Sequence, residues 1–119
     1  MEESILDSIK KDLGLPSDYQ AFDTDILMFI NGVFGTLYQL GVESAKNKRI
    51  EDSEITWEEF FDGDTDLISL IHPYTYLKVR MLFDPPTNSF VLDNMNKQAS
   101  EYEWRINIQA EGAFDVEES

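Results

Sequence analysis

The sequence predicts an all-α fold: a small bundle of about four to five helices, with a long loop between the second and third helices and an extended C-terminal tail. Apolar residues recur at three- and four-residue steps over most of the chain, which is the spacing of one helix face. Capping residues, glycines and prolines separate these stretches. The 119 residues suffice for one domain with one hydrophobic core.

The first two helices are marked by capping residues and by the glycines that end them. The first helix is expected to begin after Ser4 and to end at Gly14. The second is expected to begin at a cap formed by Asp23 or Thr24 and to close at Gly41. Its apolar stripe is broad, which predicts a central helix with neighbours on more than one side. The stripe consists of Ile26, Leu27, Ile30, Val33, Phe34, Leu37 and Tyr38.

Two glycines, Gly32 and Gly35, lie inside this second helix, where each costs about 1 kcal/mol relative to alanine. We expect another helix to pack closely over the two glycines and to offset that cost. A hinge or a bend in the helix is the alternative interpretation.

Residues 42–55 form the long loop, which is mostly polar and holds three of the nine basic residues. Loops of this length without structure of their own are usually functional or flexible. Lys46, Lys48 and Arg49 are therefore candidate contacts with an acidic neighbour. A flexible, solvated loop is the alternative interpretation of the same segment.

The middle of the chain predicts further helices. Thr56 and Glu59 form a capping box that opens a short helix. Another helical segment is expected to begin near Asp66, and Pro73 must restart or kink it. Residues 74–83 are apolar nearly all round, so a short strand is an alternative to the helix that we expect there.

The last predicted helix begins at a cap formed by Asn88 or Ser89 and completes a helical domain of residues 1–109. Residues 110–119 follow as an acidic C-terminal tail with a single aromatic residue, Phe114. Phe114 is a fourth candidate interface residue, because it can dock into a neighbouring molecule while the flanking acids meet basic groups. A disordered tail is the alternative interpretation.

The charge balance excludes several classes of partner. The chain has 24 acidic and 9 basic residues, for a formal net charge of −15. Affinity for nucleic-acid backbones comes from Lys and Arg, so we expect no such binding, and an anionic membrane does not attract the chain. No stretch approaches the ~20 apolar residues of a membrane span, and the acidic N-terminus disfavours a signal peptide. The charge keeps the protein soluble by self-repulsion, meets a basic partner, or keeps DNA off the surface.

The sequence offers no recognisable catalytic, cofactor or metal site, and we expect no enzyme. There is no cysteine, and His72 is the single histidine, which we expect to be structural. Residues 62–66 resemble the start of a calcium loop, but Leu67 replaces the required glycine and Pro73 replaces the bidentate glutamate. We therefore interpret this turn as a helix cap.

Several segments, taken in order, resemble small head–tail connector proteins of tailed phages. The resembling segments are Phe22–Ile26 continuing to Leu40–Val42, Trp57 with Phe60, Tyr74–Phe83 followed by Asp84–Thr87, and Glu101–Asn107. Each motif alone is core packing and capping, and the shared order, which covers nearly the whole chain, carries the resemblance. The His72–Pro73 pair and the longer acidic tail depart from the pattern of that family, which affects the start of the fourth helix and the role of the C-terminus.

The resemblance implies a structural virion protein that assembles as a ring beneath the portal after DNA packaging. The ring, of twelve copies if it follows the symmetry of the portal, extends the DNA channel and docks the next neck or tail-completion protein. DNA passes through without specific binding, along a wall that carries part of the excess acid. The resemblance places the protein in the virion neck, and in the host cytoplasm during assembly. A ring needs contacts between two different surfaces of each copy, for which the basic residues of the loop and Phe114 are the candidates.

The alternative function is that of an acidic protein that mimics DNA and inhibits a DNA-binding host protein. It explains the net charge without a ring and predicts a monomer or dimer with carboxylates over one exposed face. The aromatic-rich helices argue against it, because a decoy needs no such adhesive surface. A helical regulatory adaptor of the host is a third interpretation.

Overall fold

A computed structural model describes residues 3–46, 49–51 and 53–111 of the chain. Over these ranges the secondary structure is helical, with one isolated bridge between Ser4 and Thr56. The all-α prediction is confirmed. The elements are α1 (Ile5–Asp12), α2 (Asp23–Gln39), the short 3₁₀ helix η1 (Glu43–Ala45), α3 (Trp57–Phe60), α4 (Thr65–Phe83) and α5 (Ser89–Ala110).

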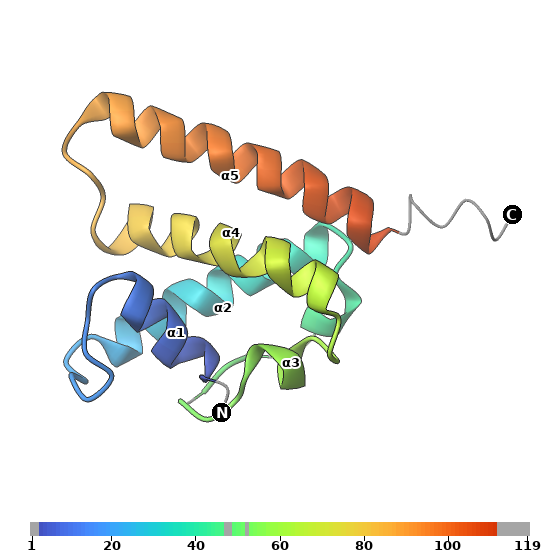
Figure 1. Ribbon diagram of the computed structural model, residues 1–119, viewed down its shortest axis with the longest axis horizontal. Helices are drawn as coiled ribbons and strands as arrows, with labels where there is room; N and C mark the ends of the chain where they lie inside the picture. The colour runs from blue at the N-terminus through green and yellow to red at the C-terminus, as the bar shows by residue number, and fades with distance from the viewer. Residues whose placement is uncertain (1–2, 47–48, 52, 112–119) are drawn as a thin grey trace, which may run out of the picture.

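Helix α4 lies in the middle of the molecule (Figure 1). It packs against α5 on one side, and against α2, α1 and α3 on the other. Helices α4 and α5 form a long antiparallel hairpin, and the chain between them turns at the left of Figure 1. The bundle therefore has three layers in the order α2, α4 and α5, with α1 and α3 beside α2.

The core forms where α2 and α4 meet the shorter helices. Phe34 of α2 is 1% exposed and lies within ring-contact distance of Phe60, Phe61 and Trp57, with ring centroids 4.9, 5.3 and 6.2 Å away. Edge-to-face and tilted aromatic pairs at these distances add to the free energy of burial. The short α3, only four residues long, is held in place by this cluster.

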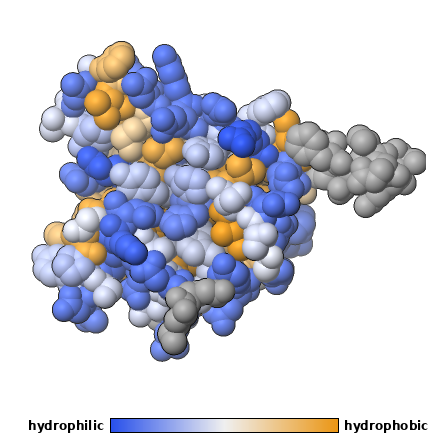
Figure 2. Space-filling view, viewed as in Figure 1, coloured by the Kyte–Doolittle hydropathy of each residue, from blue (hydrophilic) through white to orange (hydrophobic). Residues whose placement is uncertain are grey.

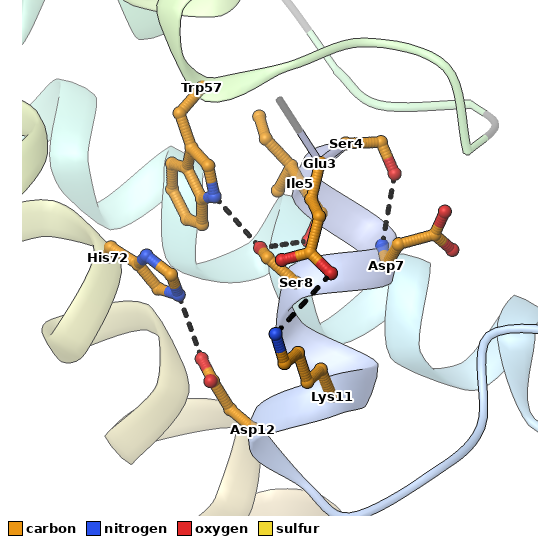
Figure 3. Close-up of polar contacts among 9 residues, drawn as sticks. All are labelled: Glu3, Ser4, Ile5, Asp7, Ser8, Lys11, Asp12, Trp57 and His72. Atoms are coloured by element: carbon orange, nitrogen blue, oxygen red, sulfur yellow. Dashed lines mark hydrogen bonds and ion pairs between the residues drawn. The ribbon is translucent and has the colours of Figure 1, made fainter. Parts of the chain in front are cut away.

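Helix α1 is tied to α3 and α4 by polar contacts that Figure 3 shows. The indole N–H of Trp57 donates to the Ser8 hydroxyl at 2.8 Å, and that hydroxyl donates to a backbone carbonyl of α1. The His72 ring stacks on Trp57, with centroids 4.6 Å apart, while its Nε2 lies 2.8 Å from Asp12 Oδ2. These contacts give His72 the structural role that the sequence predicts.

Most helix ends follow the sequence, with one correction. The hydroxyl of Ser4, the side chain of Asn88 and the capping box of Thr56 with Glu59 all cap helices as predicted. Helix α2, however, has Phe22 at its cap position, with no side-chain cap. The expected caps, Asp23 and Thr24, lie inside the helix. Asp23 Oδ1 instead forms an ion pair at 2.8 Å with the ammonium group of Lys10, which is 1% exposed.

Helix α4 runs without interruption through Pro73. Of the two expectations for that residue, a restart or a kink, the restart is wrong, and the strand alternative for residues 74–83 is wrong as well. A proline lacks the N–H that would bond to the carbonyl four residues earlier, here Ser69. The turn that precedes α4 acts as the predicted helix cap, because the Asp64 carboxylate accepts a hydrogen bond from the Leu67 amide at 3.1 Å.

Candidate interaction surfaces

The segment after α2 is anchored to the bundle instead of being solvated throughout. Val42, Ala45 and Ile50 are buried at 1, 4 and 2% exposure. The Asn31 side chain forms two hydrogen bonds with the backbone of Ile50. Its Nδ2 donates to the Ile50 carbonyl at 2.9 Å, and its Oδ1 accepts from the Ile50 amide at 2.7 Å. We name this pair the Asn31 clamp. It fixes the position of Arg49, which precedes Ile50 in the chain.

The structure describes two of the four candidate interface residues. Lys46 and Arg49 are both exposed, as an interface residue must be. Arg49 lines a groove beside α2, whereas Lys46 does not. Lys48 and Phe114 lie outside the described residues.

A broad, open groove lies beside α2, and we name it the α2 groove. Its floor is the face of α2 opposite the core, and its far wall is the segment that the Asn31 clamp holds. An ideal Cβ built on Gly32 or Gly35 would meet nothing within 4 Å. The expected helix over these glycines is therefore absent among the described residues. The groove is lined by Thr24, Leu27, Met28, Asn31, Gly32, Gly35, Tyr38, Ala45, Arg49, Ile50 and Glu51.

Helix α5 presents a second open surface. Only Ala99 and Ile106 of its 22 residues are buried, because α5 packs almost entirely on α4. The side of α5 turned away from α4, which we name the α5 outer face, carries two of the most exposed large apolar side chains, Phe90 at 72% and Trp104 at 66%. Apolar side chains reach the surface where α4 ends and α5 begins, among mostly hydrophilic ones (Figure 2). The residues of the α5 outer face are Phe90, Asn94, Lys97, Glu101 and Trp104.

Sequence reasoning missed both surfaces. Trp104 lies in the last predicted helix, and the structure shows its side chain 66% exposed. The signal was present in the sequence: Phe90 and Trp104 lie on a line with Asn94, Lys97 and Glu101 at helical spacing.

A third feature is an acidic segment, residues 51–66. It contains eight acidic residues, and no basic residue occurs between Arg49 and Lys78. The structure places this segment around α3 and the start of α4, and most of its described acidic side chains are exposed. The acidic segment therefore gives the subunit one end with a strongly negative potential.

The remaining ionisable groups of the interior are structural. The Tyr74 side chain is buried, and its hydroxyl donates a hydrogen bond at 2.8 Å to Glu103. Burial, and then the Glu103 carboxylate, raise the pKa of Tyr74 well above its ordinary value. The described residues include no group of three or more His, Asp or Glu side chains placed to hold a metal ion.

The comparisons point to one family. A family model described as "Phage connector protein" matches residues 5–113, which begins at the first residue of α1 and ends beyond the last residue of α5. No match was found among curated proteins or among solved structures. Among the described helices, none is both long and apolar enough to cross a membrane.

Proposed function

Because the chain belongs to the phage connector protein family, and so is a structural protein of the head–tail connection, we propose that it forms a ring beneath the portal. The ring extends the DNA channel and docks the next neck or tail-completion protein. Twelve copies would match the symmetry of the portal. The observation that carries this proposal is the extent of the family match, which includes all five α-helices of the described fold.

The surfaces of the subunit support a ring. A closed ring uses heterologous contacts, in which one surface of each copy meets a different surface of the next. The α2 groove and the α5 outer face are two such surfaces, one hollow and one projecting, and they belong to different layers of the bundle. No enzymatic role is part of the proposal, because the family is structural.

The acidic segment supports the channel. DNA carries one negative charge per roughly 1.7 Å of axis, so a wall of carboxylates repels the DNA and lets it slide. We therefore assign residues 54–66 of the acidic segment to the lumen of the ring, and Glu58 and Glu59 of α3 to its wall. The assignment predicts that DNA contacts in a filled particle avoid the basic residues of the chain. A lumen lined by basic side chains, with residues 54–66 on the outer rim, would contradict it.

The experiment is native mass spectrometry of the purified protein, alone and mixed with its cognate portal. The expected result is a ring in at least one sample, with the copy number of the portal. A portal from an unrelated phage, mixed at the same concentration, is the control for non-specific association. If folded protein forms no ring and does not bind the cognate portal, the proposal is wrong.

The acidic segment also favours one other function, inhibition of a DNA-binding protein by imitation of DNA. Its eight carboxyl residues could occupy a basic DNA-binding cleft. This function predicts a monomeric or dimeric protein and needs neither the α2 groove nor the α5 outer face. The same mass measurement separates the two functions, because only the connector changes its mass when the portal is added.

A further inference from the structure

We propose that the α5 outer face of one copy docks in the α2 groove of the next copy. This inference rests on the proposed function, because it requires a ring, and it deepens that function by naming the two surfaces that make the ring. The occupant of the groove is therefore a second copy of this chain, not the portal and not the next neck protein.

The first argument is the shape of the groove. Gly32 and Gly35 contribute no side chains to the floor of the groove, and the space above both positions is open. Met28 and Tyr38 flank the glycines and are 60 and 40% exposed. A second helix can approach a backbone closely only where small residues leave room for it. Each glycine destabilises α2 by about 1 kcal/mol relative to alanine. Close packing of a second helix over the glycines offsets that cost.

The second argument is length. The α2 part of the groove runs from Thr24 to Tyr38, and the α5 outer face runs from Phe90 to Trp104. Each span covers fourteen residue steps, or about 21 Å at 1.5 Å per residue. The two exposed aromatic side chains of α5 therefore lie as far apart as the two ends of the groove.

The third argument is the placement of the two surfaces. Helix α4 packs against both α2 and α5. The core side of α2 is formed by Ile26, Ile30 and Leu37, each at 0% exposure, and the groove lies on the opposite side. The α5 outer face likewise points away from α4. Because the two surfaces lie on different sides of one subunit, a contact between them is heterologous and repeats from copy to copy; such contacts form a ring when the rotation between copies closes.

The fourth argument is charge. Lys97 and Glu101 lie in the middle of the α5 outer face, and Arg49 and Glu51 lie on the wall of the groove. None of the four forms an ion pair with another residue in the described part of the chain. Docking can pair Glu101 with Arg49 and Lys97 with Glu51. Complementary charges of this kind set the register of an interface and exclude wrong partners.

The test uses the full-length protein in the sample, alone or with portal, in which the wild type forms its ring. Gly35→Leu fills the groove, and because its Cβ would meet nothing in the isolated chain, the variant is expected to fold. We expect it to lose the ring. Ser69→Leu, at an exposed position on α4, adds the same side chain outside both surfaces and is expected to keep the ring. Circular dichroism and the unfolding midpoint confirm that both variants are folded.

Charge reversal tests the register. Arg49→Glu and Glu101→Arg are each expected to lower the ring fraction several-fold, because each variant replaces an attraction across the interface with a repulsion between like charges. The double variant restores the attraction with the charges exchanged and is expected to recover most of the ring. Failure of the double variant to recover any ring would contradict the pairing.

Trp104 reports the occupant directly. Trp104 is 66% exposed, whereas Trp57 is 5% exposed, so burial of the α5 outer face shifts the emission of Trp104 to shorter wavelength while Trp57 gives a constant background. Trp104→Phe is expected to abolish the shift.

A wild-type ring without the shift would overturn the inference, and so would a Gly35→Leu variant that forms normal rings. Loss of portal binding with intact rings in that variant would assign the groove to the portal and also overturn it. Each of these outcomes leaves the proposed function standing, whereas absence of any wild-type ring refutes that function itself.

Discussion

The Asn31 clamp provides the sharpest test of how α2 holds the segment that carries Arg49. In an Asn31→Ala variant the Ile50 amide and carbonyl lose their partners, which lie at 2.7 and 2.9 Å. A hydrogen bond contributes about 1 kcal/mol net, so the loss is about 2 kcal/mol. Alanine is the better helix former by up to ~0.7 kcal/mol. The variant is therefore expected to be less stable by about 1.3 kcal/mol.

The matched control is Asn96→Ala in α5. Asn96 is also inside a helix and makes a single exposed hydrogen bond, at 3.2 Å, to a carbonyl of its own helix. Asn96→Ala therefore has the same gain in helix propensity without the loss of a clamp. Urea unfolding followed by far-ultraviolet circular dichroism measures both free energies of unfolding. If Asn31→Ala is as stable as Asn96→Ala, the clamp does not hold the segment and the reasoning is refuted.

Two further stability predictions follow from the interior contacts. Ser8→Ala removes the hydroxyl that accepts a hydrogen bond at 2.8 Å from the Trp57 indole N–H, and leaves that buried donor unpaired. We expect the free energy of unfolding, measured with urea, to fall by about 1–3 kcal/mol. An unchanged midpoint would show that water replaces the hydroxyl. The raised pKa of Tyr74, caused by burial and by the Glu103 carboxylate, means that folding keeps this phenol protonated. Its contribution is complete below the unfolded-state pKa of about 10 and is lost as the pH rises above that value. Tyr74→Phe should therefore lose less stability than the wild type between neutral and strongly alkaline pH, as urea unfolding at each pH measures.

Local signals in the sequence were sufficient for most of the helices. Ser4 and the capping box at Thr56 act over three residues, so the sequence contains every partner that such a cap needs. The break after α4 and the cap of α5 at Asn88 are equally local. Elements of this kind form from neighbouring residues, and sequence patterns predict them for that reason.

The two predictions that were wrong concern residues whose behaviour depends on contacts distant in the sequence. The Asp23 side chain is of the type that caps helices. It instead forms an ion pair with Lys10, a buried residue thirteen positions earlier in the chain. Pro73 has the chemistry of a helix breaker, yet the core contacts of Ile71 and Tyr74, both at 0% exposure, hold the helix on either side of it. In both cases a tertiary contact outweighs a local preference, and the sequence does not show which residues that contact brings together.

The candidate surfaces divide in the same way. Lys46 and Arg49 are exposed, and their role as interface residues stays a prediction. The α2 groove was not predicted, because the meaning of Gly32 and Gly35 depends on whether another helix of the same chain covers them. That is a property of the packed structure alone: the same two glycines could mark a contact inside the core or, as here, an open floor.

The net charge sets a condition that the interface must meet. Copies of charge −15 repel one another, and salt at physiological strength screens that repulsion beyond about 8 Å. The proposed apolar anchors, Phe90 and Trp104, act at contact distance and do not weaken with added salt, unlike the proposed pair of Arg49 with Glu101. A ring closed mainly by the anchors must therefore form more readily as salt is raised, whereas a ring closed mainly by ion pairs must dissociate. In the proposed ring, the carboxylates that keep DNA off the channel wall thus require an adhesive surface of the kind that the aromatic ends of α5 provide.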